Sequence, residues 1–388
     1  MRSPHILRPA LRACAAGGAT ALLCVPVVAG TAAATTTTAL PQAPFGAAPA
    51  GATKADDITL LDGTVWVAYA NGINPDGTGG ASPPNSTSTV VGYDRKTGAV
   101  VDTFSVVGKC DGLRADPANN RLIATVNEDG NSALYVLTPS TNTQVKYTYS
   151  PNPEGPIPGS NPPASAGGTD SISIVDGNVY VSHSDTPGSN TNPITYTDPA
   201  LYQVTLDPST TTANLAPVFD DNSSAVDAVT GNPVTLALTD ADSNLTMPPQ
   251  SPRFAGALAQ VSQGDGQIVF ASGLPGAPTL TQLTLSDNIP GNAPPVDDIA
   301  VATASSGTLY VVDDGTNQVQ ALSTAGLAKG TVFAAEASDN GHPLVGTLDL
   351  STGVITPLGN TFTNPHGLLF VPNAHREGHD HDGRHSRG

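Results

Sequence analysis

The chain has 388 residues and a mass of 39.0 kDa, enough for one large domain or two of medium size. It contains 40 glycines and 35 prolines. Both residue types interrupt helices, so the composition disfavours a helical bundle. With 33 acidic and 15 basic side chains, the formal charge is −18 at pH 7. Such a chain repels phosphate backbones and anionic lipid, which argues against nucleic-acid binding and electrostatic membrane binding.

Both ends of the sequence differ in composition from its centre. Residues 1–34 contain three arginines, an apolar stretch and a run of small residues, the pattern of a secretory signal peptide. The apolar stretch is short for a membrane span, which makes a retained anchor the weaker alternative. Residues 35–53, rich in Ala, Thr and Pro, are predicted to be a flexible linker, and residues 373–388 a disordered tail. We expect a secreted protein whose folded body spans residues 54–372.

The tail carries four histidines in a H-x3-H-x-H-x3-H pattern: His375, His379, His381 and His385. Neutral imidazoles at such spacing on a flexible segment can bind Zn²⁺, Ni²⁺ or Cu²⁺. The alternative is a solvated polar tail that binds no metal.

One pattern recurs between residues 56 and 372. An acidic residue or His is followed by an alternating apolar run, a tight turn, a second run, a variable loop and a third run. Alternation with a period of two is typical of strands that bury one face. The repeat begins at Asp57, Asp111, Asp170 and Asp298. A further copy is expected from strands at 257–261, 267–271 and 280–285, and a sixth unit from residues 332–371.

Units of about four short strands, repeated every ~40 to 60 residues, are typical of β-propeller blades. We predict an all-β fold, a propeller of six four-stranded antiparallel blades, with seven blades as the alternative. A pair of β-sandwiches is the competing architecture, but sandwiches lack an internal repeat. In the acidic-residue, Gly-turn and Tyr-Val elements of 170–181 and 298–312, the chain resembles the NHL, YVTN and gluconolactonase-like propeller group. The resemblance covers most of residues 56–372 and implies a fold rather than a substrate.

In a propeller, the first strand of each blade lies beside the central channel and starts on the face that carries the long loops. The residues that open these strands are therefore expected to form a partial ring at the channel mouth: Asp57, Asp111, Asp170, Asp298 and His366. They are either turn hydrogen-bond acceptors with a structural role, or ligands of a divalent cation. The carboxylates favour Ca²⁺, whereas His366 favours a transition metal such as Zn²⁺. His183 and His342 are expected on the same face, as further candidate metal ligands.

Two functions remain open. The first is a secreted, monomeric binding or scaffold propeller that holds a small molecule, glycan or peptide without turnover. The second is a metal-dependent hydrolase, lactonase or lyase that acts at the channel mouth through Asp111, Asp170, Asp298 and His366. No Gly-x-Ser-x-Gly elbow, phosphate-binding loop or His-Glu-x-x-His motif supplies a different catalytic centre.

Gluconolactonase-like propellers bind a divalent cation through a Glu on an inner strand, with Asn and Asp ligands. The resemblance implies a similar site in this chain. Here Glu128, Glu154 and Glu336 do not clearly open an inner strand, which counts against the lactonase function. A segment that resembles the start of an EF-hand loop begins at Asp240 and includes Asp242. It lacks the Gly that an EF-hand loop carries at its sixth position and has no closing Glu, so we reject an EF-hand.

Cysteine usage predicts that the exported chain contains no internal disulfide, because Cys14 and Cys24 lie in the predicted signal peptide and only Cys110 remains. Thermal unfolding of the mature protein should therefore be the same with and without dithiothreitol. A melting temperature that falls by several degrees in the reductant, with no dimer present, would contradict this expectation.

Overall fold

The computed structural model describes residues 39–80, 85–154, 167–184, 198–289 and 292–373. The predicted signal peptide and the four tail histidines lie outside these residues. The described ranges contain twenty-six β-strands, and their helices are four 3-10 turns of three residues each. The prediction of an all-β chain is confirmed. None of the described helices has the length and apolar character needed to cross a membrane.

The strands form five hydrogen-bonded sheets within the described residues. The first contains β2 (Ala55–Leu61), β3 (Thr64–Tyr69), β4 (Thr87–Asp94) and β5 (Val100–Val107), in that order. The second begins with β6 (Cys110–Asp116), β7 (Arg121–Val126), β8 (Ala133–Thr138) and β9 (Thr143–Ser150). It continues with β13 (Thr212–Asp220), β12 (Pro199–Asp207), β11 (Asn178–Ser184) and β10 (Gly168–Val175). Parallel pairing of β9 with β13 joins these two antiparallel halves at their outer strands.

The third sheet contains β16 (Ala241–Thr246), β17 (Leu258–Ser262), β18 (Gln267–Ser272), β19 (Thr279–Thr284), β14 (Ser224–Asp227) and β15 (Pro233–Thr235). The fourth contains β20 (Val296–Val301), β23 (Val332–Glu336), β24 (Leu344–Leu348) and β25 (Ile355–Pro357). The fifth contains β26 (Pro365–Pro372), β21 (Ser306–Asp313), β22 (Gln318–Ala325) and β1 (Gln42–Phe45). The 3-10 turns are η1 (Pro117–Asn119), η2 (Pro139–Thr141), η3 (Asp314–Thr316) and η4 (Ser338–Asn340).

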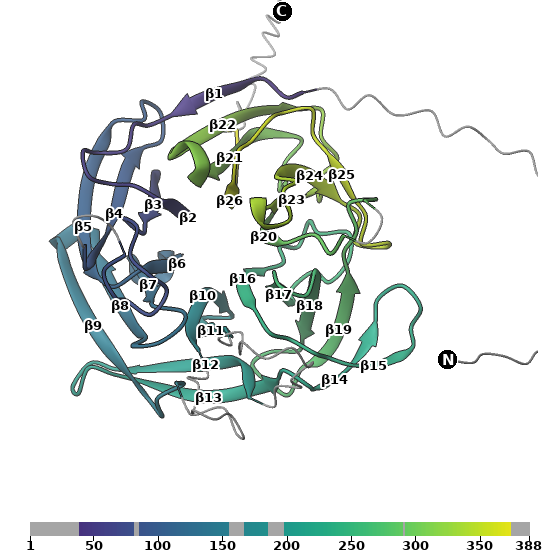
Figure 1. The fold of residues 1–388 in the computed structure, drawn as a ribbon, viewed down its shortest axis with the longest axis horizontal. Coiled ribbons are helices and arrows are strands. Elements are labelled where there is room, and N and C mark those ends of the chain that lie inside the picture. The colour runs from purple at the N-terminus through teal and green to yellow at the C-terminus, as the bar shows by residue number, and fades with distance from the viewer. Residues whose placement is uncertain (1–38, 81–84, 155–166, 185–197, 290–291, 374–388) are drawn as a thin grey trace, which may run out of the picture. The chain divides into compact units, whose positions relative to one another are not determined.

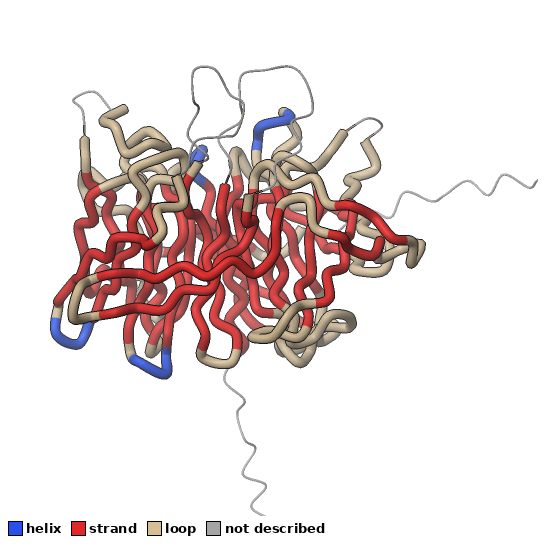
Figure 2. The backbone as a smooth tube through the Cα atoms, turned by 90° about the horizontal axis from the view of Figure 1, so that it is seen from below, coloured by secondary structure: helices blue, strands red, loops and turns tan. Residues whose placement is uncertain are grey.

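The innermost strands are arranged as a closed cycle. β2 contacts β6, β6 contacts β10, β10 contacts β16, β16 contacts β20, β20 contacts β26, and β26 contacts β2. Figure 1 shows these strands nearest the centre, with β5, β9, β13 and β25 at the periphery. Figure 2 shows that the strands run between two faces on which the loops and the short helices lie. The described chain is therefore propeller-like.

Local sequence explains the tightest turns. β2 and β3 are joined by Asp62-Gly63, and β10 and β11 by Asp176-Gly177. All four residues have positive φ, from 47° to 78°. This is the backbone of a type I′ turn, which Asp-Gly adopts readily and whose twist matches that of the flanking strands. The predicted turns at these positions are confirmed.

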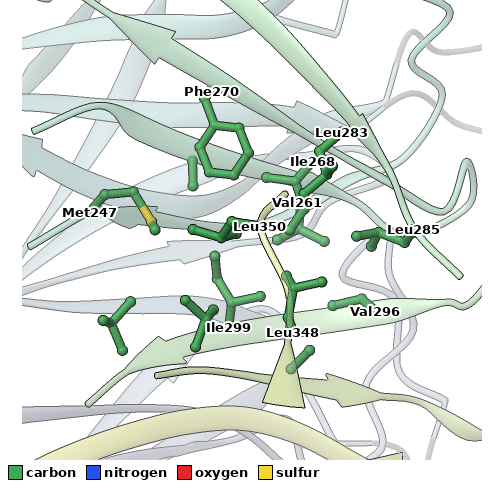
Figure 3. Close-up of a cluster of buried hydrophobic side chains, with 14 of the residues drawn as sticks. Met247, Val261, Ile268, Phe270, Leu283, Leu285, Val296, Ile299, Leu348 and Leu350 are labelled. Atoms are coloured by element: carbon green, nitrogen blue, oxygen red, sulfur yellow. The ribbon is translucent and has the colours of Figure 1, made fainter. Parts of the chain in front are cut away.

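Apolar side chains fill the space between neighbouring sheets. In the cluster of Figure 3, Val261 and Phe270 from the β16–β19 sheet pack with Ile299 on β20 and Leu348 on β24. All four are buried. Burying a side chain of this size contributes about 1.5 to 3 kcal/mol. The contacts between sheets therefore stabilise the ring in addition to the hydrogen bonds within each sheet.

The strand pairing of residues 298–312 differs from the prediction. The sequence suggested that the run after Asp298 forms a hairpin with the run at 309–312, through the turn at 305–307. Instead β20 pairs with β23, and β21 pairs with β22 and β26. The chain leaves the fourth sheet after β20, builds two strands of the fifth and then returns. The C-terminal strand β26 occupies the inner edge of β21, so this edge is closed to β20.

The predicted linker is wrong for residues 42–45. These residues form β1, which pairs antiparallel with β22, and Phe45 is only 9% exposed. The ring of Phe45 packs edge-on against Tyr310, with centroids 4.7 Å apart, and against Tyr93 at 6.0 Å. The Ala, Thr and Pro content of residues 35–53 predicted a linker, although the segment contains this one buried aromatic residue. β1 and β26, from opposite ends of the described chain, therefore lie in the same sheet.

We expect Phe45→Ala to lower the free energy of unfolding by about 3 kcal/mol, because it removes a buried aromatic side chain between two tyrosines. The matched control is Val101→Ala on β5, whose side chain is 56% exposed and should cost less than about 0.5 kcal/mol. Urea unfolding monitored by circular dichroism gives both values. Equal stability of Phe45→Ala and the wild type would show that β1 does not contribute to the folded body.

Candidate cation site at the channel mouth

All six innermost strands of the described residues carry the same irregularity near their starts. At this position two residues of the inner strand lie opposite one residue of its neighbour, which is a β-bulge. The bulge pairs are Asp56-Asp57, Asp111-Gly112, Asp170-Ser171, Asp242-Ser243, Asp297-Asp298 and His366-Gly367. The first residue of each pair is therefore an Asp in five strands and a His in the sixth.

All twelve bulge residues line one pocket with a volume of about 150 Å³. The same pocket is lined by Lys109, Glu128, Gln263 and Asp339. It contains the five residues that the sequence placed at the channel mouth: Asp57, Asp111, Asp170, Asp298 and His366. The structure brings these residues together, and their role in binding stays a prediction.

His183 and His342 are not among the residues that line this pocket. His183 is buried on β11, with its ring 5.8 Å from that of Tyr202. His342 is exposed in the segment that follows η4. Neither histidine therefore joins His366 at the channel mouth. The strand topology predicted the face on which they lie, but not their distance from the channel axis.

Asp57 and Asp298, the second residues of their bulges, link neighbouring strands. Asp57 accepts hydrogen bonds from the backbone N–H groups of Ile58 and Leu113, both at 2.6 Å. Asp298 accepts three hydrogen bonds, from the N–H groups of Ile299 and Leu368 at 2.7 Å and from Ser243 Oγ at 2.6 Å. Burial raises the pKa of Asp57 to about 8 and that of Asp298 to about 6. These contacts fit the structural interpretation of the two carboxylates.

Two side chains supply positive charge to the pocket. His366 Nδ1 lies 2.6 Å from Asp297 Oδ2 and 3.4 Å from Asp56 Oδ1. Burial lowers the pKa of His366, but the two carboxylates outweigh this effect and hold the pKa well above its usual value. Lys109 Nζ lies 2.6 Å from Asp111 and also contacts Glu128. These ion pairs neutralise part of the negative charge of four carboxylates in the pocket.

A second group of carboxylates is only partly neutralised: Glu128 pairs with Lys109, but no ion pair among the described residues includes Asp170 or Asp242. Carboxylate oxygens of Glu128, Asp170 and Asp242 lie within 4.8 Å of one another. Asp170 is 2% exposed, and its Oδ2 has no hydrogen-bond partner among the described residues. Burial and the charge of Asp242 raise the pKa of Asp170 well above its usual value. Such a group needs a proton or a cation, because a buried charge without a partner is unstable.

The chemistry of the donors indicates which cation would fit. Glu128, Asp170 and Asp242 offer oxygen atoms alone, the ligands that Ca²⁺ and other hard cations prefer. The second trio, Asp56, Asp297 and His366, could also hold a metal by its composition. All three of its members already take part in ion pairs, whereas in the first trio only Glu128 does, and Asp170 Oδ2 is buried without a hydrogen-bond partner among the described residues. The first trio is therefore the better candidate.

The pocket residues that sequence analysis did not place at the channel mouth include Asp56, Asp297, Asp242 and Glu128. The first two are the other halves of the Asp-Asp pairs at 56–57 and 297–298, and these pairs were an available signal. Asp242 lies on β16, a strand whose polar sequence lacks apolar alternation. Glu128 follows β7, which is a second strand rather than an innermost one. The strand conformation of residues 241–246 agrees with the rejection of an EF-hand loop.

No protein-family model matches the chain, and no curated protein sequence matches it. Solved structures do. A putative 6-phosphogluconolactonase from Bacteroides fragilis is 10% identical, with a TM-score of 0.44 over 87% of this chain and 99% of that one. A periplasmic gluconolactonase from Pseudomonas aeruginosa is 10% identical, with a TM-score of 0.44 over 81% and 88%. A streptogramin B lyase is 10% identical, with a TM-score of 0.37 over 86% and 97%.

We expect Asp298→Ala to lower the free energy of unfolding by about 1 to 3 kcal/mol, because backbone and hydroxyl donors lose a buried acceptor. The loss should be the same in CaCl₂ and in EDTA. Asp349→Ala, which removes an exposed carboxylate from a turn, is the control for charge. Chemical denaturation in the two buffers measures the difference. A loss confined to the calcium buffer would instead place Asp298 among the cation ligands.

Proposed function

We propose that the protein is a secreted six-bladed β-propeller that binds a hard divalent cation of the Ca²⁺ class at its channel mouth and uses it to hold an extracellular ligand. The blade count is supported by the six repeated bulges and by the closed cycle of inner strands. The observation that carries the cation site is the convergence of Glu128, Asp170 and Asp242 around a buried, unpartnered carboxylate oxygen.

The coordination positions of the cation that protein side chains do not fill determine which class of ligand can bind. Ca²⁺ takes about six to eight oxygen ligands. Three carboxylates fill part of this number, and the pocket leaves space for oxygen atoms of a bound molecule. Hydroxyl or carboxylate groups of a small molecule, a glycan or a peptide are suitable. A secreted protein would meet Ca²⁺ at a concentration that satisfies a weak site, with a dissociation constant on the order of 10⁻⁴ to 10⁻³ M.

Binding without turnover is favoured by the contacts of the two candidate proton carriers. His366 is held by Asp297, Asp56 and a hydrogen bond to the Asn364 side chain at 2.7 Å. Lys109 is held between Asp111 and Glu128. A general base must be able to reach the proton that it abstracts. Both groups are instead engaged with carboxylates of the ring.

The second candidate is a metal-dependent hydrolase, lactonase or lyase. The observation in its favour is the presence of His366 in the same pocket as the three carboxylates. A cation there could polarise a carbonyl group or activate a bound water. Acid release from simple lactones or esters that requires both Ca²⁺ and His366 would select this function over binding alone.

The test is Asp170→Asn in the full chain after removal of metal. We expect CaCl₂ to raise the melting temperature of the wild type, with about 2.7 kcal/mol of stabilisation at a hundredfold excess over the dissociation constant. The variant should bind Ca²⁺ at least tenfold more weakly. In EDTA it should be at least as stable as the wild type, because it lacks one of the crowded carboxylates.

The control is Asp94→Asn, which makes the same change of charge in an exposed turn. Isothermal titration and thermal unfolding should show wild-type calcium binding for this control. Calcium binding by Asp170→Asn with the affinity of the wild type would refute the proposed site.

A further inference from the structure

A second group of oxygen-bearing side chains lies outside the channel pocket. It forms where the segment between β19 and β20 meets the end of β23 and the turn η4. Its members are Asp287, Asn292, Glu336 and Asn340. None of them is among the residues that line the channel pocket.

The four side chains contact one another directly. Glu336 Oε1 accepts hydrogen bonds from Asn340 Nδ2 at 2.7 Å and from Asn292 Nδ2 at 3.4 Å. Asp287 Oδ2 accepts from Asn292 Nδ2 at 2.7 Å. Asn340 Nδ2 also donates to Asn292 Oδ1 at 3.0 Å. Two carboxylates thus share a small number of amide donors.

The carboxylate of Glu336 is incompletely satisfied. Glu336 is 0% exposed, and its Oε2 has no hydrogen-bond partner among the described residues. Asp287 is 6% exposed. Of the ion pairs found in the described ranges, none includes Glu336 or Asp287. Burial raises the pKa of Glu336 to about 7. Two buried carboxylates without a positive partner are unfavourable unless something supplies charge.

Another buried carboxylate of the chain shows how a purely structural Asp is satisfied. Asp313 is 2% exposed, and its two oxygens accept backbone hydrogen bonds from Asn364 at 2.8 Å and Thr363 at 3.2 Å. Each oxygen therefore has a donor. The Glu336 group differs because one oxygen is buried without a donor, which points to a missing ligand rather than to a turn acceptor.

We propose that Asp287 and Glu336, positioned by Asn292 and Asn340, form a second binding site for a hard divalent cation of the Ca²⁺ class. The two carboxylates supply charge, and backbone carbonyls or water complete a shell of about six to eight oxygens. The amide oxygens of Asn292 and Asn340 already accept hydrogen bonds from Asn340 Nδ2 and the His342 N–H group, so these two residues position the carboxylates. The group contains no imidazole or thiolate, which selects against Zn²⁺ and Cu²⁺. The bound cation replaces the missing donor at Glu336 Oε2.

The cation would support the channel pocket from outside. The segment that contains Asp287 and Asn292 leads into β20, whose bulge residues Asp297 and Asp298 line the pocket. Asn340 belongs to η4, which also contains Asp339 of the pocket lining. The second site therefore joins two segments that carry pocket residues, and its role is structural.

The experiment counts bound Ca²⁺ by equilibrium dialysis of the full chain after chelator treatment. We expect two ions in the wild type and one in Glu336→Gln, which keeps the size of the side chain but removes its charge. Asp170→Asn should also bind one ion, because it retains the Glu336 site. Asp349→Asn, an exposed change of the same charge in the turn after β24, should bind two. Histidines do not contribute to this count, because Ca²⁺ prefers oxygen ligands.

Asp287→Asn serves as a second variant and should also bind one ion, so a folding defect of Glu336→Gln, detected by circular dichroism, does not remove the test. A wild type with a single ion that is lost in Glu336→Gln and kept in Asp170→Asn would support this second site and reject the channel site. Glu336→Gln or Asp287→Asn with the same number of ions and the same affinity as the wild type would overturn the second site.

Discussion

The two-residue bulge at the start of every described innermost strand determines what the centre of the molecule can contain. In a regular strand, successive side chains point to opposite faces, so only every second residue can line a given space. A bulge places an extra residue and re-aims its side chain. Here both residues of each bulge line the pocket. Six short strands thus contribute twelve residues to a space of about 150 Å³.

This crowding brings carboxylates close together, and the chain stabilises them in two ways. Backbone N–H groups satisfy the carboxylates of Asp57 and Asp298. Lys109 and His366 form ion pairs with four others. At Asp170, neither a backbone donor nor a basic side chain reaches the buried Oδ2 within the described residues. Like charges confined in a space of low dielectric constant raise one another's pKa, and an added cation relieves this repulsion.

Features with a local cause could be predicted from the sequence. Asp-Gly turns, alternating strands such as β17 and β18, and the channel position of Asp111, Asp170 and His366 all follow from short-range patterns. Features with a distant cause could not. The pairing of β20 with β23 depends on β26, which lies more than sixty residues further along the chain. The role of β1 depends on one aromatic ring, Phe45, in a segment whose composition otherwise resembles a linker.

The fifth sheet also determines when the ring can be completed. Its outer strand β1 comes from residues 42–45, and its innermost strand β26 from residues 365–372. β26 contacts both β2 and β20, so it closes the cycle between the first and fourth sheets. A chain that leaves a ribosome or crosses a membrane with its N-terminus first delivers this strand last. The earlier sheets can pair as they emerge, but the inner edge of β21 stays unpaired until nearly the whole chain has passed. Completion of the fold is thereby tied to the arrival of the last described strand.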